Sequence, residues 1–203
     1  MNAEFKINGK IIETERLILR GFTQSDLKDF FEYASVKGVG EMAGWKHHES
    51  IEKSQEILNL FIEEDKTFAI CLKESGKVIG SLGVEKYGLE DKLTEFNGLF
   101  GREIGYVLAK PYWGKGIMPE AVSSVIDYLF NELKFDFLLC GYYDFNAQSK
   151  RVQEKCGFKP YRKLIMETRM GTNEPGVLNL LLNPQKQLTL NFSHPETLIY
   201  NKE

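Results

Sequence analysis

Apolar residues alternate with polar ones near the start of the chain and then recur at helical spacing. Within Thr14–Arg20, Leu17 and Leu19 share one face, and Asp26 follows at a position suited to capping. This segment predicts a strand that leads into a helix. A second helix is predicted after Ser50, a suitable N-cap, because apolar residues follow at i, i+1, i+4 and i+5: Ile57, Leu58, Phe61 and Ile62.

Two strand-like runs, 67–73 and 77–87, are separated by a short turn that contains Gly76, and this arrangement predicts a β-hairpin. The stretch Leu89–Gly101 is polar and contains glycine, so it predicts a long or mobile connection. The run Glu103–Leu108 then predicts another strand, which stops before Pro111.

The strongest helical pattern follows Gly116. Pro119 and Glu120 lie near its start, where a proline is tolerated and an acidic residue suits the helix dipole. One apolar stripe runs through this predicted helix: Ala121, Val122, Val125, Ile126, Leu129, Phe130 and Leu133.

The last third of the chain continues the alternation of strands and helices. It predicts a buried strand, a helix that ends at a glycine, and two closing strands: Phe137–Tyr143, Asn146–Cys156 with Gly157, Tyr161–Arg169 and Val177–Leu182. This order predicts a single α/β domain over residues 1–182. Residues 183–203 contain two prolines and only scattered hydrophobic residues, so they predict a C-terminal extension without firm structure.

Length and charge narrow the classes of protein. A chain of 203 residues can bury one sizeable core but is too short for two full domains. Its net charge of −3 and pI near 5.8 lack the basic excess of a dedicated nucleic-acid binder. No apolar run of about eighteen residues occurs and the first residues are polar or charged, so neither membrane insertion nor secretion is indicated.

The three cysteines, Cys71, Cys140 and Cys156, lie in apolar or amphipathic runs. They lack the paired spacing of a disulfide framework or a zinc site. The pattern predicts reduced, buried thiols, no metal, and a cytoplasmic protein.

A glycine-containing turn, Trp113–Met118, joins the strand Glu103–Leu108 to the long helix. The first N–H groups of a helix lack internal partners and carry partial positive charge, so a diphosphate group is favoured there. Gly114 and Gly116 allow the backbone to approach such a ligand closely. Read alone, Gly-Lys-Gly is more often an ordinary strand-to-helix turn.

Two other nucleotide-binding motifs do not fit this turn. A Walker loop requires Ser or Thr after Gly-Lys, where this chain has Gly116. A dinucleotide fingerprint requires a third glycine where this chain has Pro119, which would crowd the contact between helix and strand. ATP hydrolysis and a nicotinamide cofactor are therefore disfavoured.

These segments resemble the GNAT acetyltransferase superfamily, and more closely its RimJ/RimL-like branch. That branch shows Thr-Glu-Arg-Leu-x-Leu-Arg, Ile-Gly-Tyr-x-Leu and Tyr-Trp-Gly-Lys-Gly, which stand here at Thr14–Arg20, Ile104–Leu108 and Tyr112–Gly116. Its later Asn-x-x-Ser and Gly-Phe run is similar to Asn146–Phe158. The resemblance spans about Thr14–Leu182, and its motifs follow the order of the predicted elements.

The resemblance implies a single α/β domain with a mixed, mostly antiparallel sheet flanked by helices. It implies an N-acetyltransferase that moves acetyl from acetyl-CoA to a primary amine by direct attack in a ternary complex. The acceptor would be a protein N-terminal α-amine or a small-molecule amine, with no nucleic acid, membrane or metal involved, and homodimers are common in such enzymes. The residues implied in acetyl-CoA binding are Val107, Leu108, Trp113, Gly114, Lys115, Gly116, Ile117, Met118, Asn146 and Ser149.

The resemblance also assigns two catalytic roles. Glu103 would accept the amine proton as general base, and Ser149 would donate a hydrogen bond to the departing thiolate. The alternatives are a solvent-facing Glu103 paired with Arg102 or with a cation of a neighbouring strand, and a Ser149 hydroxyl that only supports the start of a helix. Glu85 and Glu167 are reserve candidates for the base.

The chain departs from the superfamily pattern at two positions. Met118 stands where Gly or Ala is usual, and Gln153 stands where many members carry a tyrosine that protonates the thiolate. These departures keep open a second hypothesis, a non-catalytic acetyl-CoA sensor. His47 and His48 fall in a region that helps to form the acceptor entrance in this branch, and an aromatic cluster either lines the acceptor pocket or ends a strand in the core: Tyr142, Tyr143 and Phe145.

Overall fold

The computed structural model describes residues 1–188 and 198–201. The chain forms two compact units, each assembled from separate segments. The first unit comprises Met1–Glu4, Glu85–Ile104 and Ile126–Glu203, and the second comprises Phe5–Val84 and Gly105–Val125. Strand β5 (Gly101–Leu108) and helix α3 (Ile117–Asn131) each contribute residues to both units.

The second unit contains an antiparallel arrangement of strands. Their order is β1 (Ile12–Glu13), β2 (Leu17–Gly21), β3 (Thr67–Leu72) and β4 (Val78–Glu85). The register pairs Leu19 with Ile70 and Phe68 with Leu82, which places these fully buried side chains on one face. Gly76 has a φ of 72° in the turn between β3 and β4, so the predicted hairpin is confirmed.

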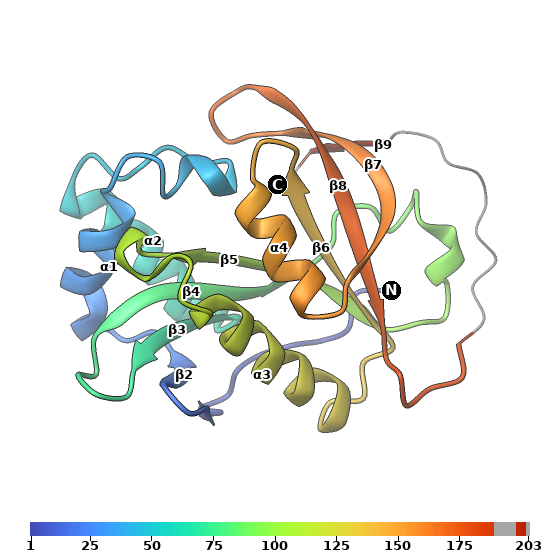
Figure 1. Ribbon diagram of the computed structural model, residues 1–203, viewed down its shortest axis with the longest axis horizontal. Coiled ribbons are helices and arrows are strands. Elements are labelled where there is room, and N and C mark those ends of the chain that lie inside the picture. Colours follow the sequence, from blue (N-terminus) through green and yellow to red (C-terminus); the bar gives the residue numbers. More distant parts are fainter. Residues whose placement is uncertain (189–197, 202–203) are drawn as a thin grey trace. The chain divides into compact units, whose positions relative to one another are not determined.

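Helices α1 (Leu27–Ala34) and α2 (Ile51–Glu64) of the second unit pack side by side (Figure 1). Their starts follow local capping signals. The Thr23 N–H donates to Asp26 Oδ2 at 2.8 Å, and Ser50 Oγ accepts from the Lys53 N–H at 3.3 Å. Both capping predictions are confirmed. The helices and strands share one core cluster: Phe22, Phe30, Tyr33, Ala34, Val39, Leu58, Ala69, Cys71, Val78 and Ala109.

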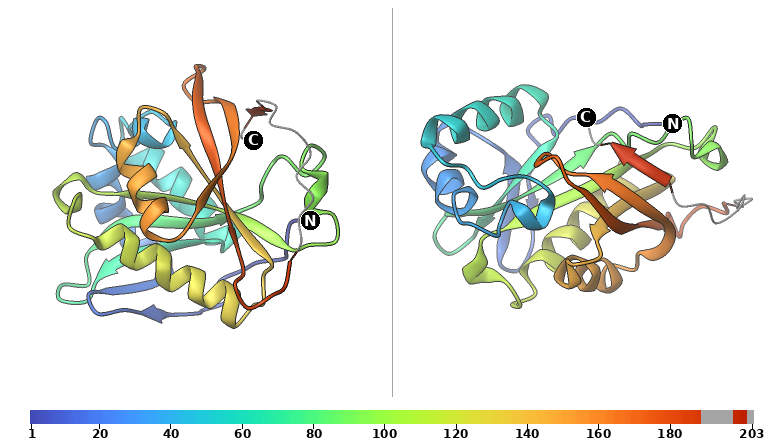
Figure 2. Two further views of the ribbon diagram at one scale, coloured as in Figure 1. Left: turned by 45° about the vertical axis from the view of Figure 1, so that its right-hand side comes forward. Right: turned by 90° about the horizontal axis from the view of Figure 1, so that it is seen from above.

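The first unit is built around β6 (Phe137–Tyr143). The start of β5 pairs with it in parallel, from Gly101–Phe137 to Glu103–Leu139, and β8 (Asn173–Leu182) pairs with it antiparallel. Strand β7 (Lys159–Glu167) forms a long, strongly twisted hairpin with β8, drawn in orange and red in Figure 2. The predicted closing strands are confirmed, with slightly different ends.

Residues after Leu182 are partly integrated into the first unit. Strand β9 (Leu198–Asn201) pairs in parallel with β7, and buried Asn183 donates to the carbonyl oxygen of Phe135 at 2.8 Å. Both contacts depend on distant segments, which explains why the local composition predicts no structure here. The remainder of the predicted extension, residues 189–197 and 202–203, lies outside the described residues.

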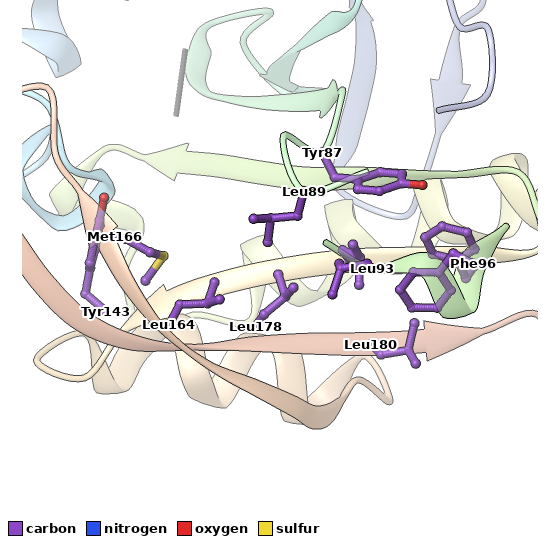
Figure 3. Packing of buried hydrophobic residues seen from close by; sticks show 11 residues of the cluster. Tyr87, Leu89, Leu93, Phe96, Tyr143, Leu164, Met166, Leu178 and Leu180 are labelled. Atoms are coloured by element: carbon purple, nitrogen blue, oxygen red, sulfur yellow. The ribbon is translucent and has the colours of Figure 1, made fainter. Parts of the chain in front are cut away.

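The connection before β5, residues 86–100, is long, as predicted, and it packs into the first unit. It contains a short 3-10 helix, η3 (Thr94–Phe96), and three of its apolar residues are buried: Leu89, Leu93 and Phe96. They pack with β6, β7 and β8 in the cluster of Figure 3. Nearly buried Glu95 binds the Tyr161 hydroxyl and the Arg162 guanidinium, which anchors the segment to β7. Its apolar residues are too widely spaced for a periodic signal, so only the tertiary contacts show its order.

Helix α3 and helix α4 (Ala147–Lys155) begin where the sequence predicts. Asn146 caps α4, and Gly157 follows it with a φ of 88°. Helix α3 ends at Asn131, so Leu133 falls outside its apolar stripe and is exposed.

Cys71 and Cys140 are buried free thiols, as predicted, whereas Cys156 is only half-buried because it forms the C-cap of α4. In the ranges 1–188 and 198–201, no group of three or more His, Cys, Asp or Glu side chains could hold a metal ion. No helix in these ranges has the length and apolar character needed to cross a membrane.

Candidate active site

The turn between β5 and α3 has the backbone conformation that the sequence predicts. Gly114 and Gly116 have φ values of 74° and 76°, in the region that side chains with a Cβ rarely adopt. Helix α3 begins directly afterwards at Ile117, so its first N–H groups follow the glycines. Ile117 and Met118 are themselves buried, which means that only their backbone can contribute to an anion site. The turn therefore combines close backbone access with the positive end of a helix.

The N-terminal strands brace this turn. Arg16 forms an ion pair with Glu120 at 2.6 Å, and its Nη1 donates to the carbonyl oxygen of Lys115 at 3.0 Å. Thr14 Oγ1 donates to the same Glu120 carboxylate at 2.5 Å. Burial opposes ionisation of Glu120, but the hydrogen bonds from Thr14 and Arg16 lower its pKa below the usual range. The Thr-Glu-Arg motif and the acidic residue of α3 are visible in the sequence, but their contact is not.

Trp113 connects the turn to the end of β5 by a hydrogen bond. Its indole Nε1 donates to the carbonyl oxygen of Leu108 at 2.6 Å, and Lys110 Nζ lies 5.8 Å from the indole ring centroid. A Trp at this position therefore supports the backbone of the turn. Lys115 is exposed, with Nζ 5.7 Å from the Tyr112 ring centroid.

Within the second unit, two contacts show which backbone groups of β5 face β4. The Ala109 N–H donates to the Ile79 carbonyl at 2.8 Å, and a Cβ on Gly80 would lie 2.4 Å from the Val107 carbonyl oxygen. Backbone groups alternate along a strand, so those of Val107 face β4 and those of Leu108 point away from it. The expectation that Val107 and Leu108 offer backbone groups to the pantetheine arm stays a prediction, and the backbone groups of Leu108 are the ones that point away from β4.

Glu103 is a buried carboxylate of the first unit. Only 1% of the residue is exposed, and it lies opposite Leu139 of β6. A Cβ on Gly141, two residues further along β6, would lie 3.8 Å from Glu103 Oε1. The alternative of a solvent-facing Glu103 paired with Arg102 is wrong, because neighbouring strand residues point to opposite faces and the Arg102 Nε donates to the Ala3 carbonyl at 2.6 Å.

Ser149 belongs to a hydrogen-bonded group at the start of α4. Its backbone N–H donates to Asn146 Oδ1 at 3.0 Å, which confirms Asn146 as the N-cap. Its Oγ lies 3.1 Å from Gln153 Nε2, and the same Nε2 donates to the Gly141 carbonyl at 3.2 Å. Asn179 Nδ2 donates to Gln153 Oε1 at 2.8 Å. Gly141 thus adjoins both the Glu103 carboxylate and the group that holds Ser149.

The reserve candidates for the base and the aromatic residues near the end of β6 have surroundings that differ from those of Glu103. Glu167 is exposed at the end of β7, and Glu85 is half-buried at the end of β4. Tyr143 is buried in the cluster of Figure 3, where it serves as a core residue. Phe145 stacks on Tyr143 with ring centroids 5.2 Å apart and is half exposed.

The two histidines are held by partners inside the second unit. His47 Nδ1 lies 2.7 Å from Glu41 Oε1, and hydrogen bonds from His47 and the Gly38 N–H overcome burial to lower the pKa of Glu41 to about 2. The ring of His48 packs against Trp45 and Phe30, and its Nδ1 lies 2.7 Å from Ser54 Oγ. The second histidine therefore has a core position.

Stability should depend on pH through His48. Burial, followed by the charges of Lys53 and His47, lowers the pKa of His48 from 6.5 to about 4. The unfolded chain takes up a proton below about pH 6.5 while the folded chain does not, so the free energy of unfolding falls as the pH drops from about 6.5 to 4. We expect a loss of roughly 2 kcal/mol over this window, measured by urea unfolding. The variant His48→Gln should lose this part of the pH dependence, and an unchanged slope would contradict the assignment.

The turn between β5 and α3 has the backbone geometry of an anion site at a helix start. Residues 16–159 match the family described as "Acetyltransferase (GNAT) domain", and the chain belongs to this family. It is an N-acetyltransferase, and acetyl-CoA is its co-substrate. Its fold is the single-domain α/β fold of the family, with a mostly antiparallel sheet and four flanking helices within the described residues.

Known proteins agree with this assignment. The Bacillus subtilis (strain 168) protein named "Probable N-acetyltransferase YjcK" is 34% identical over 136 residues, which cover 66% of this chain and 70% of that protein. The crystal structure of ribosomal-protein-S5-alanine acetyltransferase from Vibrio fischeri matches with a TM-score of 0.65 and 21% identity, over 86% of this chain and 97% of that one. Spermidine N-acetyltransferase from Vibrio cholerae, solved with CoA and spermine, matches with a TM-score of 0.67 and 18% identity, over 84% and 97%.

Proposed function

We propose that this acetyltransferase moves the acetyl group to a primary amine by direct attack in a ternary complex, with Glu103 as general base. The observation that carries this proposal is the burial of Glu103 beside Gly141. A carboxylate is rarely buried without a purpose, because removing it from water is costly. Glycine is the residue that leaves most room beside it for an acceptor.

Each proposed site residue has a role that its contacts support. The N–H groups of the turn Gly114–Met118 would bind the diphosphate, and the backbone of Leu108 would pair with the pantetheine arm. Asn146 would contact the same arm while it caps α4. Ser149 would donate a hydrogen bond to the thiolate as it leaves.

The proposed acceptor is a primary amine. One structural relative is a ribosomal-protein acetyltransferase and another acetylates spermidine. Both acceptors are primary amines. One arm of the test therefore uses peptide N-termini, the acceptors expected if the chain belongs to the RimJ/RimL-like branch. Small polyamines and amino sugars form the other arm. An expected homodimer is checked on the same sample by light scattering.

The test is isothermal titration with acetyl-CoA, followed by thiol release in the presence of each amine. Micromolar binding with amine-dependent thiol release supports the enzyme and begins to name its acceptor. Binding without release for every amine would instead favour the second candidate, an acetyl-CoA sensor, for which the replacement of the usual tyrosine by Gln153 is the observation in favour. No binding would overturn the proposal.

Gly116→Ala should weaken acetyl-CoA binding about tenfold or more. A residue with a Cβ is strained at the φ of 76°, so the folded state loses about 1–2 kcal/mol of stability if the turn keeps its shape. If the turn relaxes instead, its N–H groups turn away from the diphosphate and binding weakens. Gly98→Ala is the matched control, because Gly98 has a φ of 82° and lies outside this turn. The Gly98→Ala variant should lose a similar amount of folding free energy and keep the wild-type affinity for acetyl-CoA. Equal dissociation constants for the two variants would argue against the diphosphate site.

A further inference from the structure

Gln153 occupies the position where many superfamily members carry a tyrosine, and the structure gives it a definite environment. The residue is fully buried in α4, with 0% of its surface exposed. Its amide contacts three groups from three different elements: Ser149 Oγ, the Gly141 carbonyl and Asn179. All three lie in the first unit.

The direction of the Gln153 amide is fixed by one of these contacts. The Gly141 carbonyl can only accept a hydrogen bond, so the amide nitrogen must face it. A reversed amide would place two oxygens against each other at 3.2 Å. In the observed direction Oε1 accepts from Asn179 Nδ2 at 2.8 Å, which is consistent with the same choice.

The direction of the Gln153 amide also determines whether the Ser149 hydroxyl donates or accepts in their hydrogen bond. The amide nitrogen has two hydrogens and no acceptor capacity, so it gives one to Gly141 and one to Ser149 Oγ. The serine oxygen is then the acceptor in this contact, and its own hydrogen must be directed toward a different group. Ser149 is thereby set up as a hydrogen-bond donor.

The network is not arranged for stability alone. Asn179 Oδ1 is buried and has no hydrogen-bond partner among the described residues. An unsatisfied buried oxygen costs about 1–3 kcal/mol, which an apolar pair at positions 153 and 179 would avoid. A role of the Gln153 amide in the reaction would explain why the chain keeps this polar pair despite the lost folding free energy.

We infer that Gln153 is a positioning residue that directs the Ser149 hydroxyl toward the departing CoA thiolate. This inference rests on the proposed function. In the transfer step the amine nitrogen forms a bond to the acetyl carbon, the C–S bond breaks, and its electron pair stays on sulfur. The amine proton passes to Glu103. Ser149 keeps its proton and stabilises the thiolate by a hydrogen bond. The thiolate then takes up a proton from solvent while Glu103 releases the amine proton to solvent, so that the protons balance.

A double-mutant cycle of Gln153→Glu and Ser149→Ala tests the inference. A carboxylate at position 153 accepts from the serine hydroxyl and so reverses the hydrogen bond. We expect kcat to fall about 10- to 100-fold while KM for acetyl-CoA changes less than about threefold. In the Ser149→Ala background the same substitution should lower kcat by less than about twofold, because there is no hydroxyl left to direct. Gln148→Glu, an exposed neighbour on α4, is the matched control and should leave kcat unchanged.

A second variant guards against misfolding by a buried charge. Gln153→Met has similar size and no donor, and should lower kcat about 3- to 10-fold at temperatures well below its unfolding midpoint. Additive losses in the cycle, or a loss confined to KM, would overturn the positioning role. That failure is distinct from failure of the proposed function, in which the wild-type protein itself releases no thiol with any amine.

Discussion

Glu103→Gln is expected to lower kcat by about 10²–10⁴-fold, because a positioned general base contributes that much and the amide cannot accept the amine proton. The substitution keeps the size and shape of a side chain that is 1% exposed. The dissociation constant for acetyl-CoA should change less than about threefold, since Glu103 is assigned to the acceptor and not to the turn. Steady-state thiol release and isothermal titration measure the two quantities.

Three further glutamates complete this experiment. Glu63→Gln, on the exposed side of α2, is the control and should behave as wild type. Glu85→Gln and Glu167→Gln test the two reserve candidates for the base. If Glu103→Gln keeps more than about a third of kcat while one of the other two loses it, the base has been assigned to the wrong residue.

Phe137→Ala should cost about 3–5 kcal/mol of the free energy of unfolding, the typical loss for a fully buried aromatic residue. Phe137 has no exposed surface, and its ring stacks on Phe96 with centroids 4.1 Å apart and meets the edge of Tyr87 at 5.6 Å. These rings join the connection before β5 to β6 in the cluster of Figure 3. A cavity at this point removes contacts from both segments. Urea unfolding followed by circular dichroism measures the loss.

The matched control is Phe100→Ala. Phe100 is the same residue type in the same unit, but 48% of it is exposed. Its replacement should change the free energy of unfolding by less than about 1 kcal/mol. Similar losses for the two variants would mean that the cluster around Phe137 does not stabilise the first unit.

Elements with local signals are the ones that the sequence predicts well. The capping residues Asp26 and Ser50, the hairpin turn at Gly76 and the apolar stripe of α3 all act within a few residues, so their geometry follows from short-range physics. The order of Leu89–Gly101 and the strand β9 could not be predicted this way. Both depend on partners in β6, β7 and β8 that are distant in the sequence.

The candidate site shows the same division. The turn Gly114–Met118 and the cap Asn146 are recognisable from their position before a helix. The contact of Arg16 with Lys115 and Glu120 spans about a hundred residues, and the burial of Glu103 depends on β6. The use of Gln153 is the clearest case. Its sequence position indicates only a missing tyrosine, whereas its hydrogen bonds indicate a role for its amide.

The central claim, direct acetyl transfer to an amine, is tested most directly by mass spectrometry of both the protein and the acceptor after mixing with acetyl-CoA. Direct transfer predicts that thiol is released only when an acceptor amine is present, that the acetyl group appears on the amine in equal amount, and that the mass of the protein does not change. A burst of thiol without acceptor, accompanied by acetylation of the protein chain, would contradict it.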